Sequence, residues 1–162
     1  MGTRGLFGFK HKGKYYLIYN HCDSYYSGLG KKIVKEIKYM LDNNLLDKWI
    51  YMLENIKIID YTVNPTEEDI KQLEQYTNLK VSSRSTNDWY CLTDGCDSLI
   101  KVLESGYILH LDTSDLYEGD VEFTYVLNFD NKTLEVGPND YYAYPLDKLP
   151  NYGYCMDETL KY

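Results

Sequence analysis

The stretch Asn20-His-Cys-Asp-Ser-Tyr-Tyr-Ser-Gly-Leu-Gly30 is the most specific part of this 162-residue chain. It follows a strand-like run from Tyr15 to Asn20 and leads into a helical pattern that starts at Gly30. Upstream, residues 3–10 predict a first strand, and His11-Lys-Gly-Lys14 predicts a tight turn with glycine at its left-handed position. The sequence therefore predicts an N-terminal β-hairpin followed by a helix, with small, polar and charged groups gathered where the two meet.

Two helices are predicted after this hairpin. Residues 30–41 place apolar side chains on one face, so this helix is expected to pack against the hairpin through Ile33, Val34, Ile37 and Leu41. Apolar residues from Leu45 to Leu53 indicate the second helix, with Asn43 or Asn44 as its N-terminal cap.

The remainder alternates short strands and helices before it becomes mainly β. A capping-box pattern with Asp in place of Glu, Thr66 to Asp69, predicts a helix that runs to about Tyr76. A further helix is expected over residues 94–104, with Leu99, Ile100 and Leu103 inward and Gly106 as its end. The expected strands cover residues 57–61, 107–111, 121–129 and 133–136, the last two joined by the turn Asp130-Asn-Lys132.

These elements predict one α+β domain over residues 1–162. Its sheet is mainly antiparallel, with at least four or five strands and with helices packed on one face. The segment 138–162 is rich in tyrosine and shows no clear period, so it is expected to be an irregular C-terminal segment.

Charge and composition exclude several classes of protein. The net charge is −8, which argues against nucleic-acid binding, although residues 1–40 hold eight of the 17 basic residues and only two of the 25 acidic ones. We find no secretory signal and no apolar run of bilayer length, which predicts an intracellular protein, in a host cytoplasm or a virion, with no membrane partner. The four cysteines are expected to be free thiols, and we expect no metal and no cofactor.

The run Ser27-Gly-Leu-Gly30 before a helix is typical of an anion-binding turn, because its backbone amides are unobstructed at a helix N-terminus. Lys31 and Lys32 stand in the first helical turn, where cations oppose the helix dipole unless an anion is near. The predicted ligand-binding set, which would take a phosphate-containing small molecule, is Arg4, Tyr25, Ser27, Gly28, Gly30, Lys31 and Lys32.

Four nearby residues are candidates for catalysis. His21 and Asp23 are two residues apart and are expected to point to the same face of the strand, where they are candidates for a general base and its carboxylate partner. Cys22 is the candidate nucleophile. The order strand, strand, helix also resembles the start of an N-terminal-nucleophile hydrolase, with Thr3 as the nucleophile. Removal of the initiating methionine would expose Gly2 rather than Thr3, so that mechanism would require a further cleavage. Whether the chain is an enzyme stays open at this point.

The same block resembles an uncharacterised family of small phage and giant-virus proteins. That family is marked by an N-terminal Met-Gly-Thr-Arg, a β-hairpin and the motif Asp-(Gly/Ser)-Tyr-x-Ser-Gly-x-Gly. The matching positions here are Gly2, Thr3, Arg4, Asp23, Tyr25, Ser27, Gly28 and Gly30. The residues from Glu122 to Asp130 are similar to that family's C-terminal strands. The resemblance implies a viral accessory protein and supplies no catalytic role.

Two functional hypotheses follow from the sequence. In the first, the hairpin and the helix start bind a phosphate-containing ligand, with Arg4 holding the anion. In the second, the chain is a non-catalytic interaction or virion-associated protein. Arg4 and Asp23 then form a buried structural pair, and a tyrosine-rich surface contacts a protein partner.

Overall fold

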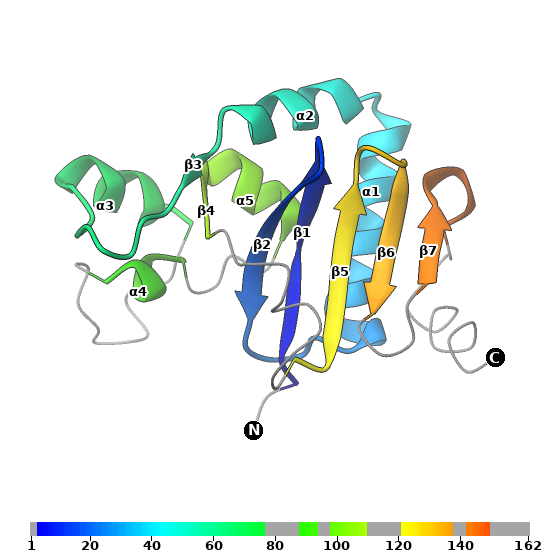
Figure 1. Cartoon of the computed structure of the whole chain (residues 1–162), viewed down its shortest axis with the longest axis horizontal. Coiled ribbons are helices and arrows are strands. Elements are labelled where there is room, and N and C mark those ends of the chain that lie inside the picture. Colours follow the sequence, from blue (N-terminus) through cyan, green and yellow to red (C-terminus); the bar gives the residue numbers. More distant parts are fainter. Residues whose placement is uncertain (1–2, 77–87, 94–97, 110–120, 138–141, 150–162) are drawn as a thin grey trace.

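The computed structural model describes residues 3–76, 88–93, 98–109, 121–137 and 142–149 (Figure 1). The elements are β-strands and helices, and the helices include a π-helix, η1, and a short 3-10 helix, η3. In chain order the elements are β1 (Gly5–His11), β2 (Lys14–Asn20), η1 (Tyr26–Gly30), α1 (Lys31–Asp42), α2 (Leu46–Glu54), β3 (Lys57–Ile58), α3 (Glu67–Leu73), α4 (Trp89–Thr93), α5 (Leu99–Ser105), β4 (Tyr107–Ile108), β5 (Phe123–Asn128), β6 (Thr133–Gly137), β7 (Tyr142–Pro145) and η3 (Leu146–Lys148).

The main sheet has five strands in the order β2-β1-β5-β6-β7. The β1–β2 and β5–β6 hairpins are antiparallel, as is the β6–β7 pair. The two hairpins meet along β1 and β5, which run parallel, with Gly5 opposite Phe123. The predicted α+β fold with a mostly antiparallel sheet and an N-terminal hairpin is therefore confirmed.

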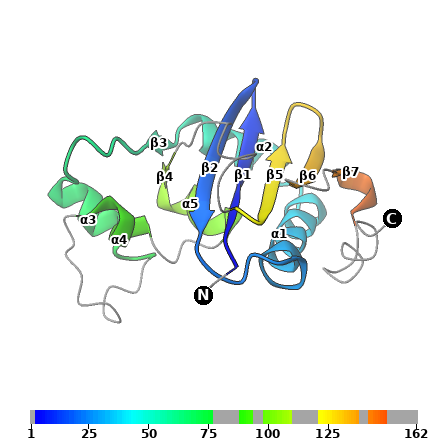
Figure 2. The ribbon, with the colours of Figure 1, turned by 60° about the horizontal axis from the view of Figure 1, so that its bottom comes forward.

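Three helices, α1, α2 and α5, cover one face of this sheet (Figures 1 and 2). The sheet contributes Phe7, Phe9 and Tyr125 to the core between the layers, and each is fully buried. The predicted inward stripe of α1 is confirmed at Ile33, Val34 and Ile37, and Met40 rather than Leu41 completes it. The 3.6-residue period of the apolar side chains places this stripe against the strands.

The opposite face of the sheet carries a smaller apolar cluster. Leu6, Leu17 and Val126 are each at most 2% exposed, and Tyr15 and Tyr19 pack against them. Strand side chains alternate between the two faces, so β1 supplies Leu6 to this cluster and Phe7 to the helical side. Because both faces of β1 are covered by apolar side chains, its sequence from Gly5 to Phe9 is apolar at successive positions and does not alternate with polar residues.

A second group of elements lies beside the main sheet, at the left of Figure 1. There the short parallel pair β3–β4 and the helices α3 and α4 surround a separate core of Ile59, Leu73, Trp89 and Leu92. The predicted capping box is present: the Thr66 side chain accepts from the Asp69 amide, and the Asp69 carboxylate accepts from the Thr66 amide.

The predicted asparagine cap of α2 is wrong. Leu45 occupies the N-cap position, and no side chain caps this helix. Asn43 instead closes the preceding helix, because its Nδ2 donates to the carbonyl oxygen of Tyr39 at 2.8 Å. Asn44 adopts a positive φ of 53°, which asparagine tolerates better than most residues, and so provides the turn between the two helices.

Several predicted elements are shorter in the structure than in the sequence pattern. Strand β3 ends at Ile58, since the Asp60 carboxylate accepts from the Thr62 amide and turns the chain. Helix α3 ends at Leu73 instead of near Tyr76.

Helix α5 begins only at Leu99, because the preceding Ser98 is an extended N-cap. Gly106 ends α5 in the left-handed conformation, as predicted. Residues 94–97, 110 and 111, which also belong to predicted elements, lie outside the described residues.

The C-terminal segment also departs from its prediction in part. Residues 138–162 were expected to be irregular, but Tyr142–Pro145 forms β7, which pairs with β6, and Leu146–Lys148 forms a 3-10 turn. The buried Tyr144 lies opposite Leu134 and belongs to the main core. Four residues are too few for a period to be recognised, so pairing with β6 decides this strand. Residues 138–141 and 150–162 lie outside the described residues.

Candidate functional site

The opening stretch forms the connection between β2 and α1. Its exposed side chains are His21, Cys22, Asp23, Tyr25 and Ser27. By contrast, Ser24 is fully buried. The connection is therefore divided between an outer polar surface and an inner anchor.

Three backbone amides of the predicted anion turn already have partners within the chain. Gly28 donates to the Tyr25 carbonyl at 3.0 Å, and Leu29 donates to the Asp23 carbonyl at 2.9 Å. Gly30 donates to Tyr25 at 3.4 Å and continues directly into α1 with helical φ and ψ. The sequence interpretation expected these three amides to be free, but they are paired, because η1 extends the helix N-terminally past these glycines.

The glycines of the motif make close packing possible. A Cβ at Gly28 would lie 2.4 Å from the carbonyl oxygen of Asp23, and one at Gly30 would lie 3.0 Å from the Tyr125 ring. A Cβ at Gly5 in β1 would lie 2.7 Å from the Cβ of Ser24. These contacts are too short for a side chain to be added without movement, so the glycines are explained by packing.

Hydrogen bonds fasten the same connection to the centre of the sheet. The hydroxyl of the fully buried Tyr125 donates to the Ser24 carbonyl at 2.7 Å, across 101 residues of sequence. The Ser24 amide donates to the carbonyl of Thr3 at 3.2 Å, and Asn20 Nδ2 donates to Ser24 Oγ at 2.8 Å. The inner half of the motif is therefore a structural junction.

In the exposed half of the connection, His21 and Asp23 each contact a tyrosine and not one another. His21 Nδ1 lies 3.2 Å from the hydroxyl of Tyr19, and the Tyr25 hydroxyl donates to Asp23 Oδ1 at 3.3 Å. The negative Asp23 carboxylate raises the pKa of Tyr25. The Asp23 carboxylate would likewise repel an anion placed beside Tyr25.

Of the other candidates, Cys22 is a free, exposed thiol, and Thr3 is half-buried. Asp23 is exposed, so the buried pair between Arg4 and Asp23 that the second hypothesis invoked is wrong. Arg4, Lys31 and Lys32 are half-buried. Their role in binding an anion and the catalytic roles of Thr3, His21, Cys22 and Asp23 stay predictions.

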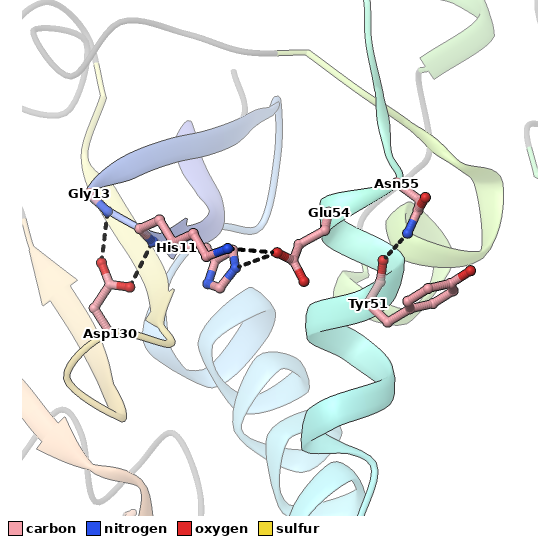
Figure 3. Close-up of polar contacts among 7 residues, drawn as sticks. His11, Gly13, Tyr51, Glu54, Asn55 and Asp130 are labelled. Atoms are coloured by element: carbon pink, nitrogen blue, oxygen red, sulfur yellow. Dashed lines mark hydrogen bonds and ion pairs between the residues drawn. The ribbon is translucent and has the colours of Figure 1, made fainter.

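The structure assembles a polar clasp that the sequence did not suggest (Figure 3). Asp130, in the β5–β6 turn, accepts from the backbone amides of Lys12 and Gly13 at 2.7 and 2.9 Å, which joins the tips of two hairpins. Glu54 at the end of α2 lies 3.1 Å from Lys12 Nζ and 3.4 Å from His11 Nε2. Asp130 was predicted only as a turn residue.

The electrostatics of the clasp fit a structural role. The hydrogen bond from Lys12 and the contact with His11 lower the pKa of Glu54, and the amides of Gly13 and Lys12 lower the pKa of Asp130. Both ring nitrogens of His11 are buried and lack a hydrogen bond of good geometry within the described residues. An enclosed imidazole of this kind offers a substrate no access.

A second polar network fixes α3 to the small sheet. The Asp69 carboxylate, 3% exposed, accepts hydrogen bonds from Tyr107, Lys57 and the Thr66 amide. Burial alone would raise the pKa of Asp69, but these hydrogen bonds outweigh it and lower the pKa well below its usual range. Burial, together with Asp69, raises the pKa of Tyr107 to about 12. Both carboxylate oxygens are used within the fold, which indicates a structural network.

A partly open pocket of about 140 Å³ lies between α1, α2 and α5. Its apolar lining comes from all three helices, through Tyr39, Trp49, Met52, Ile100 and Leu103, and from Leu45, which precedes α2. Ile100, which was predicted to face inward, is half-buried because it lines this pocket. Tyr39 is 54% exposed at the pocket, whereas Trp49 is only 4% exposed. The sequence showed the apolar periodicity of each helix but not the pocket between them.

No group of three or more His, Cys, Asp or Glu side chains is placed to hold a metal ion in the described part of the chain. In the same residues, every helix is too short or too polar to cross a membrane. Comparison with protein-family models, curated proteins and solved structures finds no match to this chain. The geometry of the chain alone therefore indicates its function.

Proposed function

We propose that this chain is a non-catalytic interaction domain that binds a protein partner through the α1–α2–α5 pocket. The observation that carries the proposal is the pocket itself, which is apolar, partly open and bordered by the exposed Tyr39. Two polar clusters of the described residues, the junction at Ser24 and the network at Asp69, are engaged in the fold itself.

The size of the pocket favours a side chain over a metabolite. Pockets for small molecules typically span about 300–1,000 Å³. An engineered cavity of about 150 Å³ accommodates one benzene molecule. A volume of about 140 Å³ therefore suits a single aromatic or large aliphatic side chain presented by another protein.

The lining residues also suit a protein interface. Tyrosine, tryptophan and methionine are enriched in protein–protein interfaces, and central aromatic anchors supply much of their affinity. Tyr39, Trp49 and Met52 bring all three types to one pocket. Methionine side chains adapt to different partners because they are unbranched and polarizable.

The alternative of a phosphate-ligand site at the hairpin and the first helix start has less support. The amides of Gly28, Leu29 and Gly30 donate to the carbonyls of Tyr25 and Asp23, and the Asp23 carboxylate beside Tyr25 repels an anion. The viral origin implied by the family resemblance stays a prediction, and the interaction proposal does not depend on it.

The test is selection from a displayed library of random 12-residue peptides, followed by measurement of Kd for the enriched sequences. Tyr39→Gln removes the exposed aromatic ring of the pocket. Tyr51→Gln on α2 is the matched control, since Tyr51 is 68% exposed and lies outside the pocket lining. We expect peptides that share one aromatic or large aliphatic residue and that bind Tyr39→Gln at least about tenfold more weakly, as loss of an interface anchor implies.

The control variant is expected to bind within about twofold of the wild type, because an exposed tyrosine away from the interface contributes little. Absence of enriched peptides would overturn the proposal. Equal losses of affinity in both variants would also overturn it, because they would show binding that does not use the pocket.

A further inference from the structure

Two residues of opposite charge line the pocket from different helices. Lys48 comes from α2 and Glu104 from α5, and both residues are exposed. They are the charged members of an otherwise apolar or aromatic lining. An apolar anchor in the pocket would therefore have a positive neighbour on the α2 side and a negative neighbour on the α5 side.

Neither charge is used in the fold as far as the described residues show. No ion pair joins Lys48 or the Glu104 carboxylate to another described residue, whereas Lys57 binds Asp69 at 3.0 Å. The backbone of Glu104 has a separate structural role, since its carbonyl accepts from the Tyr76 hydroxyl. Both side-chain charges are thus available to a partner.

We infer that the partner is a peptide segment with an acidic and a basic residue on opposite sides of its apolar anchor. The acidic residue meets Lys48 and the basic residue meets Glu104, so the pair fixes the direction in which the segment crosses the pocket. This inference rests on the proposed function. Charges at the edge of an interface govern specificity and association rate more than affinity, which matches this role.

The net charge of −8 makes the two flanks of the peptide unequal as tests of the inference. A strongly acidic domain attracts basic segments at long range, so a basic flank alone would be unsurprising. The acidic flank is the specific part of the inference, because only a local cation such as Lys48 favours it. Enrichment of an acidic flank, despite the net negative charge of the domain, would therefore show that the flank lies beside Lys48.

The experiment uses displayed peptides with one fixed aromatic anchor and random flanks, selected against the wild type, Lys48→Glu and Glu104→Lys. The wild type is expected to enrich peptides with one acidic and one basic flank. Lys48→Glu should replace the acidic preference by a basic one, and Glu104→Lys should make the reciprocal change. Each mismatched charge is expected to weaken binding by about two- to fivefold, with a smaller effect at 0.5 M salt.

Lys71→Glu and Glu74→Lys are the matched controls, because they make the same charge changes at exposed positions in and just after α3, outside the pocket. They are expected to leave the selected flanks unchanged. If the controls shift the preference as much as the pocket variants do, net charge is the cause and the inference is wrong.

The outcomes also separate this inference from the proposed function. Peptides that need Tyr39 but show no preference at either flank would overturn the polarity and leave the interaction domain standing. Failure to enrich any peptide that depends on Tyr39 would remove both.

Discussion

The β2–α1 connection and the α1–α2–α5 pocket differ in how their groups are used. In the connection, the amides of Gly28 and Leu29 and the carbonyl of Ser24 all have partners within the chain. In the pocket, apolar atoms of Tyr39 and Met52 face an open space. A distinctive sequence motif can therefore mark a structural junction, while a binding surface arises from residues that are unremarkable in sequence.

Among the tests of this contrast, Gly28→Ala is expected to have the largest effect on the free energy of unfolding. A Cβ at this position meets the backbone oxygen of Asp23 at 2.4 Å, so the connection must shift. We expect a loss of about 1–3 kcal/mol in the free energy of unfolding, as for overpacked cores, measured by urea denaturation. Ser27→Ala, one residue earlier and exposed, should change it by less than about 0.5 kcal/mol. Equal, small effects at both positions would show that the motif is not a packed junction.

Tyr125→Phe is expected to have the next largest effect. It removes the hydroxyl that donates to the Ser24 carbonyl and leaves a buried acceptor without its partner. A loss of about 1–2 kcal/mol is expected by thermal or urea denaturation. Tyr51→Phe removes the same hydroxyl from an exposed ring and should be neutral. A neutral Tyr125→Phe would show that this hydrogen bond does not anchor the connection.

A smaller effect is expected in the titration of Tyr25, followed by NMR of tyrosine labelled with 13C at Cζ. The Asp23 carboxylate disfavours the tyrosinate, so the pKa of Tyr25 should lie above its ordinary value of 10.0 and should fall in Asp23→Asn. The folded state then retains this proton to higher pH than the unfolded state. The associated stability is fully present below the ordinary tyrosine pKa and is lost as the pH rises from there through the raised pKa of the folded state. A pKa below 10.0 in the wild type would instead indicate a cationic, anion-accepting corner.

The smallest expected effect is that of Tyr39→Gln on stability. Its ring is 54% exposed, and glutamine is a good helix former, so the free energy of unfolding should change by less than about 0.5 kcal/mol. Circular dichroism during thermal unfolding checks this. A loss comparable with that of Gly28→Ala would mean that Tyr39 belongs to the core, and the contrast between the two regions would disappear.

Predictions from sequence succeeded where the interactions are local. The β1–β2 hairpin follows from alternating residues and a Gly13 turn, and the capping box of α3 follows from Thr66 and Asp69 three residues apart. The prediction failed in Tyr142–Pro145, where pairing with β6 decides the structure. It also failed at Asn43, where a bond to Tyr39 four residues earlier closes α1 in place of the expected cap of α2. For the candidate site, the sequence located the Asn20–Gly30 motif but could not show that the amides of Gly28, Leu29 and Gly30 were already paired.

The sequence by itself determined the two hairpins, the inward stripe of α1 and the left-handed end of α5 at Gly106. These features depend on residues a few positions apart, whose spacing can be read directly. Only the tertiary structure decided the parallel pairing of β1 with β5, the contact of Gly30 with Tyr125 and the pocket between three helices. These depend on side chains that are distant in the chain and meet only when the layers pack, so no local pattern encodes them.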